Sequence, residues 1–474
     1  MPLIFFRLLF LKARHTLETV LSMNERIVII GGGFGGLYAA KRLKKAPVEV
    51  TLIDRRNHHL FQPLLYQVAT GTLSPADITT PLRTLFKNQP NTRVLLAEVL
   101  DFDVANKQVI LRDGVVPYDT LIVAAGSGKN YFGNSHWMAN APGLKTVEDA
   151  TEIRGRILTA FEAAERTTDP VKQRAWLTFV VIGGGPTGVE MAGALAEIAH
   201  ETLRDEFRHI NPSDARVILV QSGERLLPTY PPELSIKAAA ALERLGVEVW
   251  TGRRVVDVQE RSVTLAAQGV EEKLATRTIL WTAGVQASPL GKALATATGA
   301  QVDRGGRVMV EPDLSVPGYP DVFVIGDLAH FAHQTGEALP GVAQVAIQQG
   351  RYVARLIKRR RAGKSIAPFH YQDRGNMATI GRGKAVAEIG RYRLSGWLAW
   401  QLWLVIHLMY QLDLQNRVLV FVQWLWNFAT RRRSALLITE RDQQVTTIEP
   451  YTGLKLITST GTFRSIRDTA SRFQ

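Results

Sequence analysis

Two glycine-rich stretches, each following a short apolar run, constrain the fold of this chain more than any other feature. They read Arg26-Ile-Val-Ile-Ile-Gly-Gly-Gly-Phe-Gly-Gly36 and Val180-Val-Ile-Gly-Gly-Gly-Pro-Thr-Gly-Val-Glu190, and both contain Gly-x-Gly-x-x-Gly. In a strand–turn–helix unit such glycines permit a tight turn and a close backbone approach, so that the helix N-terminus can hold a pyrophosphate. A single match is often only a glycine-rich turn. Two matches that open the same pattern predict two dinucleotide-binding units.

The rest of the first unit is consistent with such a site. After a predicted helix, the strand Val48–Asp54 ends in an acid roughly twenty residues beyond the turn, where a carboxylate can accept hydrogen bonds from an adenosine ribose. An ordinary aspartate at a strand end is the alternative. The later strand Tyr118–Gly126 ends in small residues that can pass close to a cofactor. The candidate cofactor contacts of this unit are Gly31, Gly33, Phe34, Gly35, Gly36, Asp54 and Gly126.

The second unit repeats this plan with one difference. Its second strand, Ala215–Gln221, ends in a neutral amide where an acid would favour the free 2′-hydroxyl of NADH and repel the 2′-phosphate of NADPH. The amide weakens that discrimination. Arg225 could approach a phosphate, or it could be solvated or paired with an acid. The candidate contacts are Gly183, Gly185, Pro186, Thr187, Gly188, Gln221 and Gly284, and Glu190 follows directly after the turn.

Two later segments add polar groups to these units. The strand-like run Val322–Ile325 leads to Gly326 and Asp327, and this carboxylate could bond the sugar or ribityl hydroxyls of a cofactor. After Ala343, Gln344 and Gln348 lie four residues apart and therefore on one helix face. Their small apolar neighbours favour a pair that faces something buried, although a solvent-exposed pair is the usual explanation.

Composition limits the chemistry that the chain can perform. The 474 residues are enough for two or three domains and a sizeable core. The absence of cysteine excludes disulfides, iron–sulfur clusters and cysteine nucleophiles. His330 and His333 lack an adjacent acid cluster, so we expect no metal site. The net charge of +14 suits an anionic surface, and without a nucleic-acid-binding motif we favour lipid headgroups over nucleic acid.

The two ends of the chain differ in character from the units between them. Residues 1–23 resemble neither a clean signal peptide nor a spanning helix, so we expect a disordered or non-native leader, with a mitochondrial presequence as the alternative. Near the C-terminus, the runs Trp397–Tyr410 and Val418–Phe428 are apolar, rich in tryptophan and followed by Arg431-Arg-Arg433. Each is shorter than the ~20 residues of a spanning helix. They predict helices lying in a membrane interface, with a buried hairpin or a homodimer interface as alternatives.

These motifs resemble those of the type II, or alternative, NADH dehydrogenases, which are NADH:quinone oxidoreductases that do not pump protons. The resemblance extends from about residue 25 to residue 437. Its most specific parts are Gly31–Gly36, Phe61–Ala69, Val181–Glu190, Val324–Asp327, Ala343–Gln349, Met377–Val386 and the Trp-rich tail.

The resemblance implies an α/β fold with two Rossmann-like domains, as in two-dinucleotide-binding flavoproteins, and a C-terminal membrane-interface helical region. Residues 24–145 and 300–380 would bind FAD non-covalently. Residues 146–299 would bind NADH and, given Gln221, also NADPH, and residues 381–474 would attach to the membrane. The residue matching Glu190 would lie by the nicotinamide and the flavin. Those matching Gln344, Gln348 and Lys384 would border the site of a ubiquinone or menaquinone.

The resemblance also implies a location, and two related classes compete with it. We expect a peripheral protein on the cytoplasmic face of a bacterial plasma membrane, with the mitochondrial inner membrane as the alternative. Sulfide:quinone and disulfide reductases share the scaffold, but they need redox cysteines that this chain lacks. A flavin-containing regulatory protein of the apoptosis-inducing-factor type would form long-lived complexes with reduced nicotinamide and would reduce quinone poorly.

Overall fold

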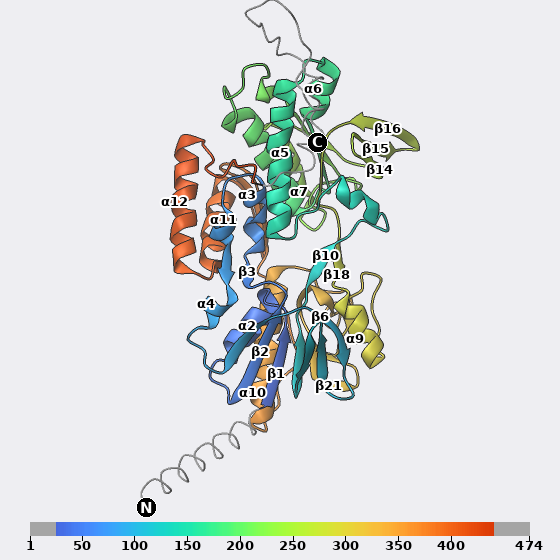
Figure 1. Cartoon of the computed structure of the whole chain (residues 1–474), viewed down its shortest axis with the longest axis vertical. Coiled ribbons are helices and arrows are strands. Elements are labelled where there is room, and N and C mark those ends of the chain that lie inside the picture. The colour runs from blue at the N-terminus through green and yellow to red at the C-terminus, as the bar shows by residue number, and fades with distance from the viewer. Residues whose placement is uncertain (1–24, 440–474) are drawn as a thin grey trace, which may run out of the picture.

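The computed structural model describes residues 25–439, so the expected leader and the last residues of the tail lie outside the described part. Two α/β units are stacked along the long axis of the molecule, and a helical hairpin lies against one side (Figure 1). The lower unit is built around β1, β2 and α10, and the upper unit contains α5 and α7. The predicted architecture of two dinucleotide-binding units and a C-terminal helical region is confirmed.

The first unit is built on a six-stranded sheet of order β20-β21-β9-β1-β2-β5, in which only β20 is antiparallel to its neighbour. Residues 27–30 of β1 are buried without a break, which is typical of a parallel strand covered on both faces. Because β21 runs parallel to β9, it brings Asp327 to the sheet edge where the first glycine turn lies. The strands are β1 (Glu25–Ile30), β2 (Val48–Asp54), β5 (Thr92–Leu96), β9 (Thr120–Val123), β20 (Ser315–Val316) and β21 (Tyr319–Val324).

Helices α2 (Phe34–Arg42) and α10 (Ala343–Arg361) pack against each other beside this sheet. At their contact, a Cβ on Gly350 would lie 2.3 Å from the carbonyl oxygen of Gly35, so only glycine allows this approach. Smaller elements complete the unit: β3 (His58–Leu60), α3 (Leu65–Ala69), β4 (Thr79–Pro81), α4 (Leu82–Phe86), β6 (Val99–Asp103), β7 (Gln108–Leu111), β8 (Gly114–Pro117), β19 (Val308–Met309) and β22 (Ala329–His330).

The second unit has a four-stranded parallel sheet of order β13-β12-β11-β17. The long helix α5 begins with a capping box in which Thr146 and Asp149 satisfy each other's backbone N–H groups. A three-stranded antiparallel sheet, β14-β15-β16, lies beside the parallel one (Figure 1). The elements are α5 (Val147–Arg166), α6 (Pro170–Trp176), β11 (Thr178–Ile182), α7 (Pro186–Glu197), β12 (Arg216–Val220), α8 (Pro232–Glu243), β13 (Val247–Trp250), β14 (Arg254–Gln259), β15 (Ser262–Ala267), β16 (Val270–Ala275) and β17 (Thr278–Trp281).

Two antiparallel strands, β10 (Ser127–Lys129) and β18 (Val285–Ala287), pair where the chain passes between the units. Helix α9 (Leu290–Thr298) follows β18 and packs against β6 of the first unit. The sequence had placed these helical residues in the second unit, with a boundary at residue 299. The residue pattern of a sequence can predict a helix, but it does not show which sheet that helix packs against.

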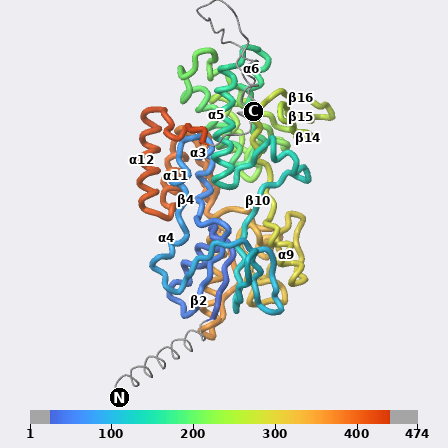
Figure 2. Tube along the Cα trace, viewed as in Figure 1, coloured from blue at the N-terminus to red at the C-terminus, as the bar shows by residue number. Residues whose placement is uncertain are grey.

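The C-terminal region starts with the antiparallel sheet β23-β24-β25 and continues into helices α11 and α12, which lie beside α3 (Figures 1 and 2). The bounds are β23 (Asn376–Gly381), β24 (Lys384–Ile389), β25 (Tyr392–Gly396), α11 (Trp397–Tyr410) and α12 (Leu414–Thr430). Trp403 and Val420 belong to the same core cluster as α3, α5 and α7. The hairpin is therefore an integral part of the folded body. None of the described helices is both long and apolar enough to cross a membrane.

Candidate functional site

The first glycine turn leaves open space outside the N-terminus of α2. Gly31 has a φ of +100°, and a Cβ on it would lie 2.3 Å from the carbonyl oxygen of Ala124. A Cβ on Gly36 would lie 1.9 Å from the carbonyl oxygen of Gly31. A Cβ on Gly33, by contrast, would meet nothing within 4 Å. The turn is therefore closed toward the protein and open in front of the helix, which is the shape that a pyrophosphate requires.

Asp54 fixes this turn from the neighbouring strand. Its Oδ2 accepts a hydrogen bond from the backbone N–H of Gly32 at 2.6 Å, and its Oδ1 accepts one from the backbone N–H of Arg56 at 2.7 Å. Nδ1 of His59 lies 2.9 Å from the carbonyl oxygen of Gly32. This residue was not identified from the sequence. Burial lowers the pKa of His59 to about 4, so its ring is neutral. Phe34 packs edge-to-face on that ring, with centroids 5.0 Å apart.

The second turn repeats this geometry with an amide in place of the acid. Gly183 has a φ of +110°, and a Cβ on Gly188 would lie 1.8 Å from the carbonyl oxygen of Gly183. Gln221 accepts a hydrogen bond through Oε1 from the backbone N–H of Gly184 at 2.9 Å. The amide oxygen thus takes the part that the Asp54 carboxylate plays in the first turn. The amide nitrogen remains an N–H donor, where an acid would offer a second acceptor.

Arg225 is not available to a cofactor. Its Nη1 donates to the carbonyl oxygen of Tyr230 at 2.7 Å and to Oγ of Ser235 at 2.9 Å, and its Nη2 donates to the carbonyl oxygen of Pro228 at 2.7 Å. The guanidinium holds its own loop against α8. The suggestion from sequence that Arg225 approaches a phosphate is not supported, because the side chain is committed to three neighbouring oxygens.

Asp327 lies in a polar cluster between the two units. Its Oδ2 accepts a hydrogen bond from Ser127 Oγ at 2.6 Å, and Lys145 Nζ donates to the same Oγ at 3.2 Å. The loop before Asp327 is held by the buried Gln349, whose Oε1 accepts a hydrogen bond from the backbone N–H of Gly326 at 2.6 Å. Ser127, Lys145 and Gln349 were missed from sequence. Only the position of Gln349, directly after Gln348, could have drawn attention to it.

Gln344 and Gln348 bind backbone rather than facing a cavity. Gln344 donates to the carbonyl oxygen of Gly375 at 2.9 Å and accepts from the N–H of Arg374 at 3.2 Å. Gln348 donates to the carbonyl oxygen of Gln372 at 2.8 Å and accepts from its N–H at 3.0 Å. Both amides therefore fasten α10 to the segment that leads into β23.

Glu190 lines a cavity of about 110 Å³ between α3, α7, β23 and the C-terminal hairpin. Burial raises the pKa of its carboxyl well above the usual range, although a hydrogen bond from the backbone of Thr379 opposes this shift. The surroundings of the carboxyl therefore favour its protonated form beside this cavity. Aromatic and polar side chains share the lining, among them Tyr66, Gln67, Trp400, Trp403, Trp424 and Asn427.

The remaining predicted residues lie around these sites. Pro186 and Thr187 open α7, Ala343 opens α10, and Gly126 and Gly284 both have positive φ. Lys384 begins β24 and does not belong to the lining of the cavity. His330 lies 2.9 Å from Asp303, and His333 lies 2.7 Å from the carbonyl oxygen of Val310. Within residues 25–439 no group of three or more potential ligands could hold a metal ion.

Comparisons with known proteins identify the family. A family model described as pyridine nucleotide-disulphide oxidoreductase matches residues 25–350, and one described as the NDH2 C-terminal domain matches residues 374–433. The type II NADH:quinone oxidoreductase Ndh of Mycobacterium tuberculosis is 48% identical over 426 residues, which cover 88% of this chain and 91% of that protein. The chain belongs to the type II NADH:quinone oxidoreductase family.

Other relatives agree with this assignment. NdhA of Mycobacterium tuberculosis, also a type II NADH:quinone oxidoreductase, is 47% identical and covers 88% of this chain and 90% of its own length. The solved structure of NDH2 from Plasmodium falciparum in complex with NADH has a TM-score of 0.81, at 22% identity, over 87% of this chain and 100% of that chain. The likeness to that structure shows a shared fold.

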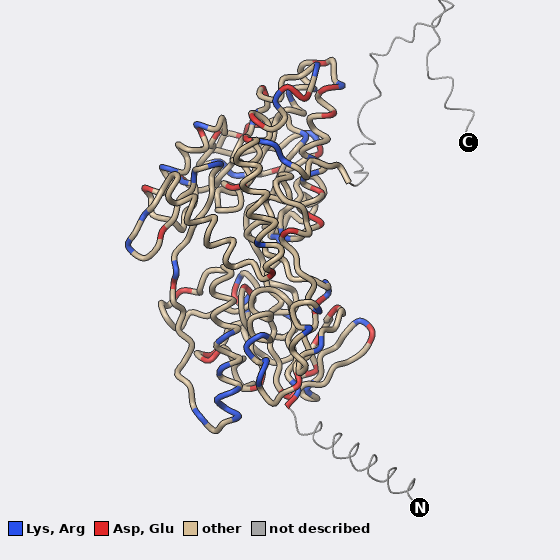
Figure 3. The backbone as a smooth tube through the Cα atoms, turned by 90° about the vertical axis from the view of Figure 1, so that its left-hand side faces the viewer, with Lys and Arg blue, Asp and Glu red and all other residues tan. Residues whose placement is uncertain are grey.

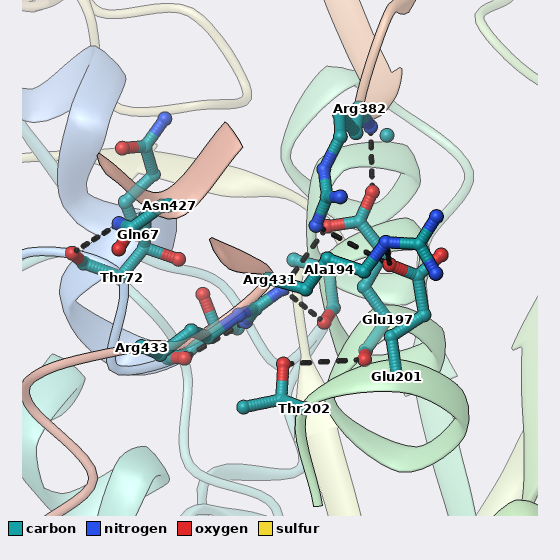
Figure 4. A network of polar contacts seen from close by, with 12 residues as sticks. Gln67, Thr72, Ala194, Glu197, Glu201, Thr202, Arg382, Asn427, Arg431 and Arg433 are labelled. Atoms are coloured by element: carbon teal, nitrogen blue, oxygen red, sulfur yellow. Dashed lines mark hydrogen bonds and ion pairs between the residues drawn. The ribbon is translucent and has the colours of Figure 1, made fainter. Parts of the chain in front are cut away.

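In this member of the type II NADH:quinone oxidoreductase family, the C-terminal hairpin is tied to the body by arginines (Figure 4). Directly after α12, Arg433 Nη2 lies 3.1 Å from Glu197 Oε2, and Arg431 Nε lies 3.9 Å from Glu201 Oε2. Sequence reasoning assigned residues 431–433 to membrane headgroups. Arg433 instead points into the protein, and only Arg431 and Arg432 are exposed.

The outer face of this hairpin is apolar and exposed. Helix α11 contains no Lys, Arg, Asp or Glu, and α12 contains only Arg417; in Figure 3 the C-terminal hairpin is correspondingly drawn mostly in tan. The tryptophans of α11 are divided between the surface and the core, because Trp397 is exposed whereas Trp403 is buried against His407. Leucine, valine and phenylalanine form most of the outer face. Its exposed large apolar residues are Trp397, Leu398, Val405, Met409, Leu414, Val418, Leu419, Phe421, Val422, Leu425, Trp426 and Phe428.

Proposed function

We propose that this protein is a peripheral membrane flavoenzyme that oxidises NADH and reduces a membrane quinone through a non-covalent FAD, without pumping protons. The observation that carries the proposal is the cavity lined by Glu190. It lies between the helix of the second glycine turn and the apolar C-terminal hairpin, so a nicotinamide site and a lipid-facing surface would both adjoin this cavity. The membership in the type II NADH:quinone oxidoreductase family supports the same activity.

The residues of the first unit fit FAD. The open space at Gly33 would receive the pyrophosphate at the N-terminus of α2, Asp54 would bond the adenosine ribose, and Asp327 would bond the ribityl chain. Because the chain has no cysteine, a thioether link to the flavin is excluded. When bound, FAD supplies hydride acceptance from the nicotinamide and two-electron transfer to the quinone.

The second unit would hold the nicotinamide cofactor. A Cβ on Gly185 would meet nothing within 4 Å, so this position leaves room for the pyrophosphate in front of α7. Gln221 would contact the adenosine ribose through its N–H donor, and this donor is compatible with a 2′-hydroxyl and with a 2′-phosphate. Because the chain belongs to an NADH:quinone oxidoreductase family, we propose NADH as the main substrate, with NADPH oxidised more slowly but measurably.

The cavity would receive the quinone ring from the hairpin side. Burial favours the protonated form of Glu190, which lines the cavity and would supply a proton to a quinone oxygen. Gln344 and Gln348 would act on this site through the segment 372–375, which they hold at the start of β23. Lys384, on β24, which pairs with β23, would act from outside the lining of the cavity.

The apolar face of α11 and α12 would lie in the membrane interface. Exposed leucine, valine, phenylalanine and tryptophan side chains bury well at the boundary between headgroups and acyl chains, and Arg431 and Arg432 would meet anionic headgroups. We place the protein on the cytoplasmic face of a bacterial plasma membrane, where NADH is produced and quinone is dissolved in the bilayer.

Anaerobic stopped-flow absorbance separates the two half-reactions of this proposal. Mixing with NADH should bleach the flavin band, and mixing the reduced protein with a ubiquinone or menaquinone analogue should restore it. Acid denaturation should release the flavin into the supernatant. Reduction by NADH into a long-lived complex that quinone does not reoxidise would refute the proposal and favour a regulatory flavoprotein.

A further inference from the structure

An ion pair lies beside Gln221, at the ribose end of the second glycine turn. The backbone N–H of Gln221 donates to the carbonyl oxygen of Trp250 at 2.8 Å, and the N–H of Arg253 donates to the carbonyl oxygen of Gln221 at 3.1 Å. Nη1 of Arg253 lies 2.6 Å from Oε2 of Glu272 on β16. Gln221, the first residue after β12, is thus bonded to the last residue of β13 and to the loop that follows it. These are the carboxyl ends of the strands, where nucleotides bind in such sheets.

The guanidinium of Arg253 is held in place from two sides. It lies over the ring of Trp250, with its central carbon 4.1 Å from the ring centroid, and it pairs with Glu272. The side chains of Arg253 and Glu272 are 32% and 53% exposed, so both groups remain in contact with solvent. Arg225, the other guanidinium near this strand end, is committed to its own loop. Arg253 is therefore the arginine that backbone contacts place next to Gln221.

We propose that Glu272 is a specificity-determining residue of the nicotinamide site, which it biases toward NADH by pairing with Arg253 beside Gln221. This inference rests on the proposed function of the second unit. A guanidinium is well suited to a phosphate because its N–H groups form a planar fork. While Glu272 holds Nη1 of Arg253, a 2′-phosphate must compete with a carboxylate for that N–H group and also meets its negative charge.

The ion pair between Arg253 and Glu272 is weak enough for a 2′-phosphate to compete with it. Ion pairs between exposed side chains are weak, so Glu272 does not hold Arg253 irreversibly. Gln221 has no charge and cannot itself repel the 2′-phosphate. An acid at position 221 would discriminate against NADPH. In this chain Glu272, on β16 of the antiparallel sheet, takes over that role.

The test uses the FAD-loaded full-length enzyme and compares kcat/KM for NADPH and NADH. Glu272→Gln should raise the NADPH value about two- to fivefold and change the NADH value less than about 1.5-fold. Anaerobic flavin reduction by NADPH should accelerate in parallel. The gain should shrink at high ionic strength, because exposed charges are screened. Adding Arg253→Gln to Glu272→Gln should abolish the gain.

Glu271→Gln is the matched control, because neighbouring residues of a strand point to opposite faces. It removes the same charge from the same strand and should leave the ratio of the two kcat/KM values unchanged. An unchanged ratio in Glu272→Gln, with NADH still reducing the flavin, would overturn this inference alone. A protein in which NADH does not reduce the flavin would instead overturn the proposed function. An equal gain in Glu271→Gln would reduce the effect to net charge and would also overturn the inference.

Discussion

Arg433 and Glu197 form an ion pair of 3.1 Å whose side chains are only 7% and 14% exposed. The same guanidinium donates to the carbonyl oxygens of Thr70 at 2.8 Å and Ala194 at 3.0 Å. One side chain near the end of the described chain thus contacts segments on both sides of the cavity (Figure 4). Arg433 therefore forms part of the cavity wall and also attaches the segment after α12 to α7 and to the loop after α3.

Arg433→Gln should destabilise the protein strongly. It leaves the Glu197 carboxylate without its cationic partner in a buried position, which typically costs about 3–5 kcal/mol. Urea unfolding followed by flavin fluorescence measures this loss. Arg393→Gln is the control, because it breaks an exposed pair with Glu233 and should cost less than about 1 kcal/mol. Equal losses in the two variants would contradict the role of burial.

Glu190→Gln should slow turnover about tenfold or more while leaving the flavin content unchanged. Burial raises the pKa of this carboxyl, so it keeps its proton above the usual range and loses it only as the pH rises through the raised value. A rate that depends on the protonated form is therefore flat at lower pH and falls at higher pH. The glutamine variant should lack this fall. Loss of FAD from the variant would place Glu190 in the flavin cradle instead.

Gln344→Ala and Gln348→Ala should impair the quinone half-reaction selectively. Each change removes two hydrogen bonds to the segment 372–375 and so loosens the approach to β23. We expect a higher apparent KM for quinone or a lower quinone-dependent rate, with flavin reduction by NADH changed less than about twofold. Stopped-flow measurements of both half-reactions decide this. Equal slowing of the two steps would count against a quinone-side role.

Leu398→Glu, Val422→Glu and Trp426→Glu in one chain should abolish membrane binding. All three side chains are exposed on the hairpin, so their replacement opposes burial in lipid without opening the core. Co-sedimentation with anionic phospholipid vesicles should show a soluble variant that retains FAD and reduces a water-soluble quinone. Ile236→Glu and Val270→Glu, at exposed positions outside the hairpin, form the control. If high salt completely removed the wild-type protein from the vesicles, charge alone would attach the protein to the membrane.

Gln221→Glu should suppress the use of NADPH selectively. The new carboxylate would take the place of the amide that bonds Gly184 and would repel a 2′-phosphate, at a cost of a few kcal/mol at most, or up to about a hundredfold in kcat/KM. The kcat/KM for NADH should stay within about threefold of the wild-type value. If wild type already fails to oxidise NADPH, the neutral residue at position 221 is not what sets the specificity.

The sequence by itself determined the two nucleotide units and the type of their turns. Gly31 and Gly183 stand where the backbone needs a positive φ, and Gly36 and Gly188 stand where any Cβ would strike a carbonyl oxygen. These are local requirements of a strand–turn–helix unit, and they are readable from residue type and spacing. Asp54 and Gln221 could be identified for the same reason, because a fixed strand length places them opposite the turn.

Only the tertiary structure decided where side chains from distant segments point. Gln344 and Gln348 share a helix face, as their spacing predicts, but the segment 372–375 occupies that face. Arg433 reads as one of three basic residues after an apolar helix, yet the turn after α12 directs it toward Glu197. Helical periodicity fixes which residues share a face. It contains no information on which distant element packs there, and that packing set the cavity around Glu190.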